Sequence, residues 1–406
     1  MTFRPSPVSR RHFLQRSALA GAASALGLKA FAEDTITLPF ANGERKLAKF
    51  PGKRPLILQT SRPPQLETPF SVFNEGVITP NDAFFVRYHL ANIPLSIDPD
   101  TYRLAVKGHV EKPLDLSLAE LRKMDAVELV AVNQCSGNSR GFFVPRVGGG
   151  QSGNGNMGNA RWRGVPLKAV LEKAGVKAGA KQVVFDGLDK PVLEKTPDFI
   201  KALDLDHAAD GEVMLAYEMN GEPLPMLNGF PLRLVVPGCY GTYWVKHLSD
   251  ITIIPDTLEN FWMATAYRIP CTPGAAIPPG TTPAKTEPIQ RFNIRSFITS
   301  LADGATLKAG QPLDVRGIAF DGGSGIREVL LSSDGGNSWG TASLGDDLGR
   351  YSFRPWTRSV VFGTPGAFEL KCRAISRTGE SQPLDPLWNP SGYMRNVVET
   401  VKVQVV

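Results

Sequence analysis

The sequence predicts an α+β protein in which a mixed α/β domain is followed by an all-β, immunoglobulin-like sandwich. The chain has 406 residues, which is too long for one ordinary hydrophobic core. It contains 40 glycines and 33 prolines, a composition that favours turns and β structure over a helical bundle. A proline-rich stretch at 271–288 separates two regions of different pattern. We therefore expect a first domain over 33–288, which includes this linker, and a second domain over 289–406.

The first 32 residues have the features of a twin-arginine export signal. Arg10 and Arg11 precede a mildly apolar segment rich in alanine and glycine, and Ala-Phe-Ala at 30–32 matches an A-x-A cleavage site. The segment is too short and too mild to span a membrane, which takes about 20 apolar residues. We expect a signal at 1–32, export of the folded protein and a periplasmic product without a membrane span.

The charge distribution argues against a nucleic-acid-binding protein. The formal net charge is +6, but residues 1–32 hold five basic side chains and no acidic one. The rest of the chain is close to neutral and has no dense cluster of lysine and arginine. It therefore offers little electrostatic attraction for DNA, RNA or an anionic membrane.

The cysteines are scattered and form no Cys-x-x-Cys motif, so the sequence predicts neither a disulfide framework nor a covalently attached haem in this chain. The four positions are Cys135, Cys239, Cys271 and Cys372. The five histidines are too few and too dispersed for a zinc site.

The segment at 33–70 is rich in proline and lysine and shows little periodicity, so we expect an extended segment that wraps the first domain. The stretch at 81–90 has the alternation of a strand, with Phe85, Arg87 and His89 on one side. Taken alone, arginine and histidine on a strand face are more often an ion-pair edge than a site.

The stretch at 132–141 places Cys135 between an apolar run and a polar, glycine-rich turn. Residues 127–132 have the pattern of a short buried strand, and the sequence then changes to amide and small residues, with Arg140 close behind the cysteine. A single cysteine is most often a packing residue. These surroundings instead suit a thiolate that binds a soft metal, with an arginine available for an anion beside it.

Two helices and a glycine-rich stretch follow in the first domain. Ser-Leu-Ala-Glu at 117–120 is a capping box that opens a short helix through 124. A second helix is expected from Pro166 to a stop at Gly175. The run at 147–159 has no core pattern: it is either a flexible linker or a loop whose glycines let the backbone approach a ligand. Residues 183–189 have the pattern of a strand and a turn, and Asp189 can stabilise that turn.

The end of the first domain combines basic and aromatic residues. Arg233 and Lys246, together with backbone amides of the nearby turns, are the groups that an anionic ligand needs, although a lone basic residue is usually a solvated charge. The phenol of Tyr267 can donate a hydrogen bond to an oxyanion and relay a proton. Its alternative role is packing at the domain edge.

The second domain shows short strands separated by tight turns. The turn signals Asp-Gly-Gly at 321–323 and 334–336 divide expected strands at 291–301, 313–319, 328–333, 351–355, 368–376 and 398–406. This spacing is typical of an immunoglobulin-like sandwich.

Taken together, these segments resemble the sulfite oxidase family of molybdenum enzymes, and especially its bacterial periplasmic members. Cys-Ser-Gly-Asn-Ser-Arg at 135–140 is similar to the family's Cys-x-Gly-Asn-x-Arg segment, and Phe-Val-Arg-Tyr-His at 85–89 to its Phe-Val-Arg-x-His segment. The resemblance implies a molybdenum-molybdopterin cofactor with Cys135 as the metal ligand. It implies cofactor contacts from Phe85, Val86, Arg87, Tyr88, His89, Cys135, Asp189, Asn228, Arg233, Trp244, Val245 and Lys246. It implies a substrate-anion site made by Arg87, Arg140, Tyr267 and Arg395.

The activity implied by this resemblance is oxidation of sulfite to sulfate with electrons passed to a c-type cytochrome, which is a separate acceptor or a bound subunit. The second domain would form a homodimer, or the chain would pair with a haem subunit. The sequence departs from the family pattern near Ser152, where many members carry a tryptophan, and at Asn228, where animal members have histidine.

Two other functions remain open from the sequence. The first is a periplasmic molybdenum reductase of the same superfamily, similar to a methionine sulfoxide reductase catalytic subunit, although those relatives generally lack the second domain. The second is an exported binding protein without catalysis, in which Cys135 is inert.

Overall fold

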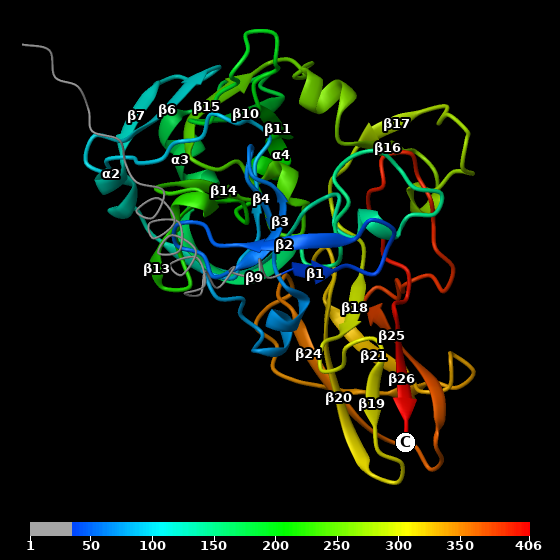
Figure 1. Cartoon of the computed structure of the whole chain (residues 1–406). Helices are drawn as coiled ribbons and strands as arrows, with labels where there is room; N and C mark the ends of the chain where they lie inside the picture. The colour runs from blue at the N-terminus through cyan, green and yellow to red at the C-terminus, as the bar shows by residue number, and fades with distance from the viewer. Residues whose placement is uncertain (1–34) are drawn as a thin grey trace, which may run out of the picture.

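The computed structural model describes residues 35–406, and this part of the chain is built mainly of β-strands (Figure 1). The expected signal at 1–32 lies outside the described residues. The α-helices are short: α2 (Leu118–Arg122), α3 (Leu167–Ala174) and α4 (Leu205–Ala208). Single turns of 3₁₀ or π type are η1 (Phe70–Asn74), η2 (Arg140–Phe142), η3 (Met226–Asn228), η4 (Gly241–Tyr243), η5 (Phe261–Thr265) and η6 (Pro273–Ala275). No helix between residues 35 and 406 combines the length and the apolar character that a membrane crossing requires.

The N-terminal segment forms a sheet rather than the expected extended wrap. Its antiparallel order is β1-β2-β3-β4-β5, and the strands are β1 (Thr35–Thr37), β2 (Glu44–Ala48), β3 (Leu56–Thr60), β4 (Gln65–Glu67) and β5 (Val86–Arg87). The segment is held in place because Leu56 and Leu66 are fully buried together with Val86. The strand expected at 81–90 is reduced to β5, since the chain leaves the sheet after Arg87 and His89 stacks on Phe199.

Two further sheets make the body of the first domain. One has the order β11-β10-β15-β6-β7 and the other β13-β12-β9-β8, with β14 paired to β12. Strands β15 and β6 pair in parallel, and the other neighbours pair antiparallel. The strands are β6 (Arg103–Gly108), β7 (Leu114–Ser117), β8 (Val127–Gln134), β9 (Met157–Pro166), β10 (Gln182–Gly187), β11 (Lys201–Asp204), β12 (Met214–Met219), β13 (Glu222–Pro223), β14 (Arg233–Val235) and β15 (Leu248–Ile254).

The helix signals in this domain are found where the sequence predicts them. Ser117 and Glu120 form the capping box of α2, which ends at Arg122, two residues before the expected end. Helix α3 follows Pro166 and ends at Gly175, whose φ of 67° is the left-handed conformation that favours glycine. Leu167, Val170 and Leu171 form the buried face of α3, in a core shared with both sheets.

The C-terminal region consists of two facing sheets. One has the order β18-β20-β24-β23 and the other β19-β26-β25-β21-β22. They share a core that includes Val315 and Trp356 from the first sheet and Leu370 and Val403 from the second. The strands are β18 (Arg295–Ile298), β19 (Ala305–Leu307), β20 (Pro312–Phe320), β21 (Ile326–Ser332), β22 (Gly340–Thr341), β23 (Ser343–Leu344), β24 (Arg354–Val361), β25 (Gly366–Ser376) and β26 (Thr400–Val405). The proline-rich linker also contains a strand that the sequence did not predict: β17 (Thr286–Pro288) pairs with β16 (Arg268–Pro270).

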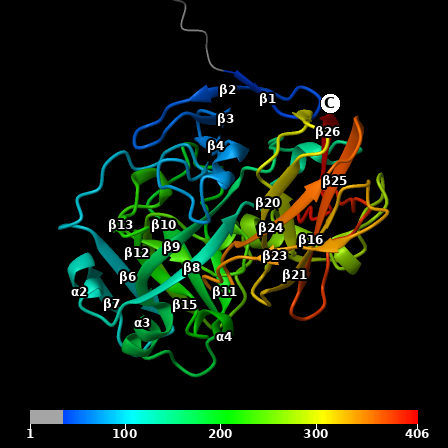
Figure 2. The ribbon, with the colours of Figure 1, turned by 90° about the horizontal axis from the view of Figure 1, so that it is seen from below.

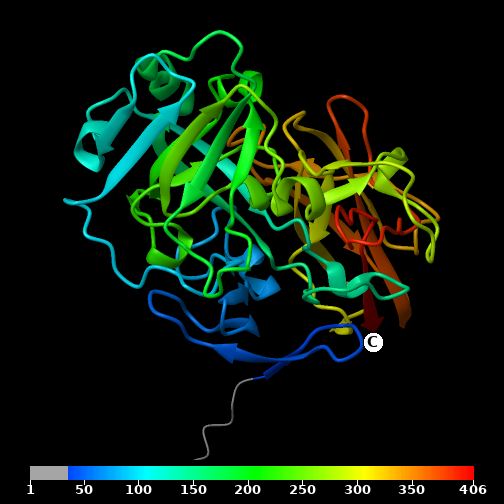
Figure 3. The same ribbon diagram turned by 90° about the horizontal axis from the view of Figure 1, so that it is seen from above.

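The first domain and the C-terminal sheets lie side by side, with the N-terminal sheet running along both (Figures 2 and 3). They share an aromatic core, in which Phe73 and Tyr240 pack with Phe292, Phe297 and Phe353. The backbone N–H of Val132 in β8 donates to the carbonyl of Tyr351 at 2.9 Å. The strand that leads to Cys135 is therefore bonded to the C-terminal region.

Candidate active site

A cavity lies where segments from distant parts of the first domain meet. It is lined by nine of the residues that the sequence assigns to a site, namely Phe85, Arg87, His89, Cys135, Asn228, Arg233, Trp244, Lys246 and Tyr267. These residues come from β5, the end of β8, η3, β14, the turn after η4 and the approach to β16. The tertiary fold thus brings into one place side chains that are up to 182 positions apart in the sequence.

Cys135 sits at the edge of this cavity because β8 ends one residue before it. The strand is buried over its last five residues, and the chain then turns, with the N–H of Asn138 donating to the Cys135 carbonyl at 3.0 Å. The Cys135 N–H donates to the carbonyl of Asn156 at 2.9 Å. The thiol is free and half-buried. A thiol in this position can bind a metal ion in the cavity.

The charged groups of the cavity are cationic. Arg87, Arg233 and Lys246 line it, and in the described part of the chain no aspartate or glutamate does. Burial lowers the pKa of Arg233 to about 9, and its guanidinium lies 5.0 and 5.6 Å from the ring centres of Trp162 and Trp244. Removal from water likewise lowers the pKa of Lys246. Such a concentration of buried positive charge is costly without an anion.

Several polar atoms at the cavity have no hydrogen-bond partner among the described residues. They are Asn133 Oδ1, Ser136 Oγ, Arg233 Nε and Thr242 Oγ1, and all four residues line the cavity. Buried polar groups are nearly always satisfied. Unpaired donors and acceptors beside three cations fit an anionic ligand that is rich in hydrogen-bonding groups.

Tyr267 and His89 form a hydrogen-bonded pair at one wall. The phenol oxygen is within hydrogen-bond distance of His89 Nε2. Burial, followed by the charges of Arg87, Lys246 and Lys201, holds the pKa of His89 well below its usual value, and burial raises the pKa of Tyr267. Near neutral pH the imidazole is therefore neutral and the phenol keeps its proton, so Tyr267 can donate a hydrogen bond.

Comparison with known proteins identifies the family. Residues 89–262 match the oxidoreductase molybdopterin binding domain, and residues 286–406 match the Mo-co oxidoreductase dimerisation domain. Mitochondrial sulfite oxidase of Rattus norvegicus is 34% identical, over 86% of this chain and 66% of that protein. Sulfite oxidase of Gallus gallus is 35% identical, over 85% of this chain and 76% of its own length. The chain belongs to the sulfite oxidase family of molybdenum enzymes.

A solved structure shares the same architecture. The sulfane dehydrogenase SoxCD from Paracoccus pantotrophus aligns with a TM-score of 0.71 at 25% identity, covering 93% of this chain and 90% of that one. The chain spans about two thirds of the length of the rat relative. The family's cofactor is molybdenum bound to molybdopterin. The cationic, hydrogen-bonding cavity with a free thiol at its edge fits that group.

Four residues assigned to cofactor contact lie beside the cavity rather than in its lining. Val86 and Val245 are buried in apolar clusters. The Tyr88 hydroxyl pairs with His247 Nε2 at 2.6 Å. Asp189 is buried close to Lys246, where burial raises the pKa of its carboxyl group and the lysine opposes that change. Their side chains support residues of the lining, and contact through their backbone atoms stays a prediction.

The ring of Tyr393 separates Arg140 from Tyr267, a residue of the predicted substrate site. Its guanidinium is over the ring of Tyr393, 5.0 Å from the centre, and its Nε donates to the Ser391 carbonyl at 3.2 Å. Tyr393 in turn stacks on Tyr267 with ring centres 5.5 Å apart. Arg140 thus contacts Tyr393 and is not in the lining of the cavity, and its role in substrate binding stays a prediction.

Arg395 does not line the cavity, and its role at the substrate site stays a prediction. It pairs with Glu399, four residues later, and lies over the ring of Phe142 at 4.9 Å. It lines a different and larger hollow between the N-terminal sheet and the C-terminal region. The nearby carboxylate gives the guanidinium a counter-charge, which explains this orientation.

Sequence reasoning missed two buried lysines. Lys53 Nζ donates to Asn228 Oδ1 at 2.5 Å and to the Phe84 carbonyl at 2.9 Å. Lys201 Nζ donates to the Trp262 carbonyl at 2.7 Å and lies 5.4 Å from the ring centre of Tyr267. Burial lowers the pKa of each to about 7. Neither lysine lies in a recognisable sequence motif. Asn133 and Ser136 line the cavity and were also missed, although their positions close to Cys135 were a signal that could have identified them.

Proposed function

We propose that this protein oxidises sulfite to sulfate at a molybdenum-molybdopterin centre. The observation that carries the proposal is the cavity itself, in which a free thiol and three cations meet and to which no carboxylate of residues 35–406 contributes. The sulfite oxidases of rat and chicken, with 34% and 35% identity, support the choice of substrate.

The residues divide between holding the cofactor and binding the substrate. The Cys135 thiolate would hold the metal, while Arg233, Lys246 and Asn228 would bind the anionic and polar groups of the pterin. When bound, the molybdenum centre supplies the oxygen-transfer and two-electron chemistry. Overall, sulfite gains one oxygen atom from water and gives up two electrons, and the water releases two protons.

The side chains Arg87 and Tyr267 would bind the substrate oxyanion. The Arg87 guanidinium provides charge-assisted hydrogen bonds, each worth roughly 1.5–3 kcal/mol. The protonated phenol of Tyr267 donates another, and the hydrogen bond to the neutral imidazole of His89 holds the phenol in place. The low dielectric of the cavity strengthens these contacts.

The electron acceptor, location and assembly complete the proposal. The acceptor is a c-type cytochrome, either a separate protein or a bound haem subunit. The twin-arginine pattern at 1–32 supports location in the periplasm. The two facing sheets of the C-terminal region and its match to a dimerisation domain support an immunoglobulin-like sandwich that forms a homodimer or a heterodimer.

The test is a steady-state assay on the full chain purified from a periplasmic extract, with elemental analysis of the same sample. We expect about one molybdenum per chain and sulfite-dependent reduction of cytochrome c. Parallel assays use thiosulfate as a sulfane donor, and methionine sulfoxide with a reduced dye. A loaded protein that acts on either of these and leaves sulfite unchanged would refute the proposal, and absence of molybdenum would point to a binding protein.

A further inference from the structure

One arginine of the C-terminal region is buried against the first domain. Arg295 in β18 is 1% exposed, and its guanidinium lies 4.5 Å from the ring centre of Phe297. A buried cation is costly unless charges or hydrogen bonds compensate it. Its surroundings must therefore supply that compensation.

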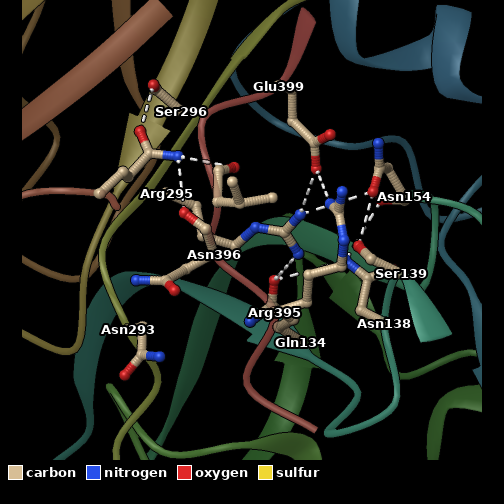
Figure 4. A network of polar contacts seen from close by, with 12 residues as sticks. Gln134, Asn138, Ser139, Asn154, Asn293, Arg295, Ser296, Arg395, Asn396 and Glu399 are labelled. Atoms are coloured by element: carbon tan, nitrogen blue, oxygen red, sulfur yellow. Dashed lines mark hydrogen bonds and ion pairs between the residues drawn. The ribbon is translucent and has the colours of Figure 1, made fainter. Parts of the chain in front are cut away.

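The partners of Arg295 come from both domains (Figure 4). Within its own domain it pairs with Glu399, at 3.1 Å. Across the interface, its Nη1 donates to Gln134 Oε1 and its Nη2 to Asn154 Oδ1, both at 3.4 Å. Gln134 immediately precedes Cys135, and Asn154 lies in the glycine-rich loop that packs against the cysteine turn.

Glu399 does not depend on Arg295 for its counter-charge. The same carboxylate also pairs with Arg395, so two guanidinium groups share one acid. The amide oxygens of Gln134 and Asn154 therefore compensate part of the positive charge of Arg295. The contacts across the interface are thus part of what makes burial of Arg295 tolerable.

Both amides also bond to the turn that carries Cys135. Gln134 Oε1 accepts from Asn138 Nδ2 at 3.3 Å, and Asn154 Oδ1 accepts from Ser139 Oγ at 2.5 Å. These contacts are visible in Figure 4. One guanidinium from the second domain therefore links the strand end before Cys135 to the loop that holds the residues after it.

We propose that Arg295 is a positioning residue, through which the C-terminal region fixes the Cys135 turn, residues 134–140, in the conformation that presents the thiol to the cavity. The proposal rests on the proposed function to the extent that Cys135 is taken as the metal ligand. Arg295 does not line the cavity, so it acts through Gln134 and Asn154 and not on the substrate.

The first experiment compares Arg295→Met and Arg295→Lys with the unchanged full chain by hydrogen exchange. We expect amides of 134–140 and 150–156 to exchange roughly tenfold faster in Arg295→Met, because the turn loses two hydrogen bonds from a charged donor. Arg295→Lys keeps the charge next to Glu399 but not the planar fork, so its exchange should be intermediate. It also provides a folded variant if Arg295→Met does not accumulate.

The matched control is Arg373→Met. Arg373 belongs to β25 of the same domain, and its bonds to the Gln382 carbonyl at 3.0 Å and to Ser381 Oγ at 2.8 Å stay within that domain. Exchange of 134–140 should be unchanged in this variant. Equal acceleration in the control and in the Arg295 variants would reduce the effect to general destabilisation and overturn the proposal.

The second readout separates positioning from substrate binding. With sulfite, kcat of Arg295→Lys should fall about tenfold while KM stays within about twofold, because Arg87 is untouched. Unchanged exchange and unchanged kcat in both Arg295 variants would refute the positioning role. Faster exchange of the turn in a protein that does not oxidise sulfite would instead support the positioning role and refute the proposed function.

Discussion

At the scale of single residues, the cavity combines one soft ligand with cations that are kept from water. Cys135 is half-buried with its thiol free, whereas Cys239 and Cys372 are buried and inert, with pKa values raised to about 12 by burial. Reactivity of a cysteine depends on forming the thiolate near an accessible site. Among the cysteines at the cavity and in the core, Cys135 alone meets that condition.

Substitution Cys135→Ser should keep the fold and abolish turnover, because a hydroxyl does not replace a thiolate as a soft-metal ligand. Circular dichroism would check the fold, and an assay with sulfite would check activity. Cys271→Ser serves as the control, since that cysteine is exposed and does not line the cavity. Retained activity in Cys135→Ser would rule out the ligand role.

Substitution Arg87→Ala should raise KM for sulfite by roughly ten- to a hundredfold, the loss expected for one charge-assisted contact. Molybdenum content should be maintained, because Cys135 and Arg233 are unchanged. Lys246 donates to the backbone carbonyl of Arg87, and that contact survives truncation of the side chain. An unaltered KM would remove Arg87 from the substrate site.

At the scale of elements, the glycine-rich stretch is a fixed loop rather than a linker. The N–H groups of Gly153 and Gly155 donate to the Glu67 carboxylate at 3.1 and 2.9 Å. A Cβ on Gly155 would lie 1.9 Å from the Thr68 carbonyl oxygen. The loop can therefore pack between β4 and the cysteine turn only because glycine allows close backbone approach.

Substitution Gly155→Ala should lower the free energy of unfolding by roughly 1–3 kcal/mol through this overlap with backbone. Gly148→Ala is its control, because a Cβ there meets nothing within 4 Å and its φ is not in the left-handed region. Denaturant unfolding of the two variants gives the comparison. Equal free energies of unfolding for the two variants would show that the loop can shift to accommodate the added Cβ at no cost.

Glu67 makes the loop sensitive to pH. Burial raises the pKa of its carboxyl group from 4.5 to about 7. The folded protein thus holds this proton more tightly than the unfolded chain, and the resulting stability, on the order of 3 kcal/mol, is present below pH 4.5 and lost as pH rises through about 7. We expect Glu67→Gln to flatten the fall in Tm between these pH values. An equal fall in Tm in the unchanged protein and in Glu67→Gln would contradict this.

At the scale of the whole molecule, the two regions are joined by a shared core. Phe73 and Tyr240 of the first domain pack with Phe292, Phe297 and Phe353, and Arg295 links the interface to the cysteine turn. Separation would expose this aromatic surface to water, at a cost that grows with its area. The regions should therefore unfold together.

Scanning calorimetry of the full chain should accordingly show a single endotherm. Phe297→Ala opens a cavity in the shared core and should lower the free energy of unfolding by roughly 3–5 kcal/mol. The Tm should fall, but the endotherm should remain single. Two well-separated transitions in the unchanged protein would show that the domains are energetically independent.

The sequence by itself determined the mostly β organisation, the capped helices α2 and α3, and the turn that presents Cys135. These features follow from local rules, since caps, turn residues and strand alternation act over a few neighbouring positions. It also located Arg87, Arg233, Lys246 and Tyr267, all of which line the cavity.

Only the tertiary structure decided how distant side chains combine. Lys53 and Lys201, from segments without a motif, contact the lining residues Asn228 and Tyr267. Arg395 pairs with Glu399, and Arg295 reaches Gln134 from 161 positions away. Sequence spacing carries no information on such pairs. Their geometry is set by packing of whole sheets, which places charges next to partners that the local pattern cannot specify.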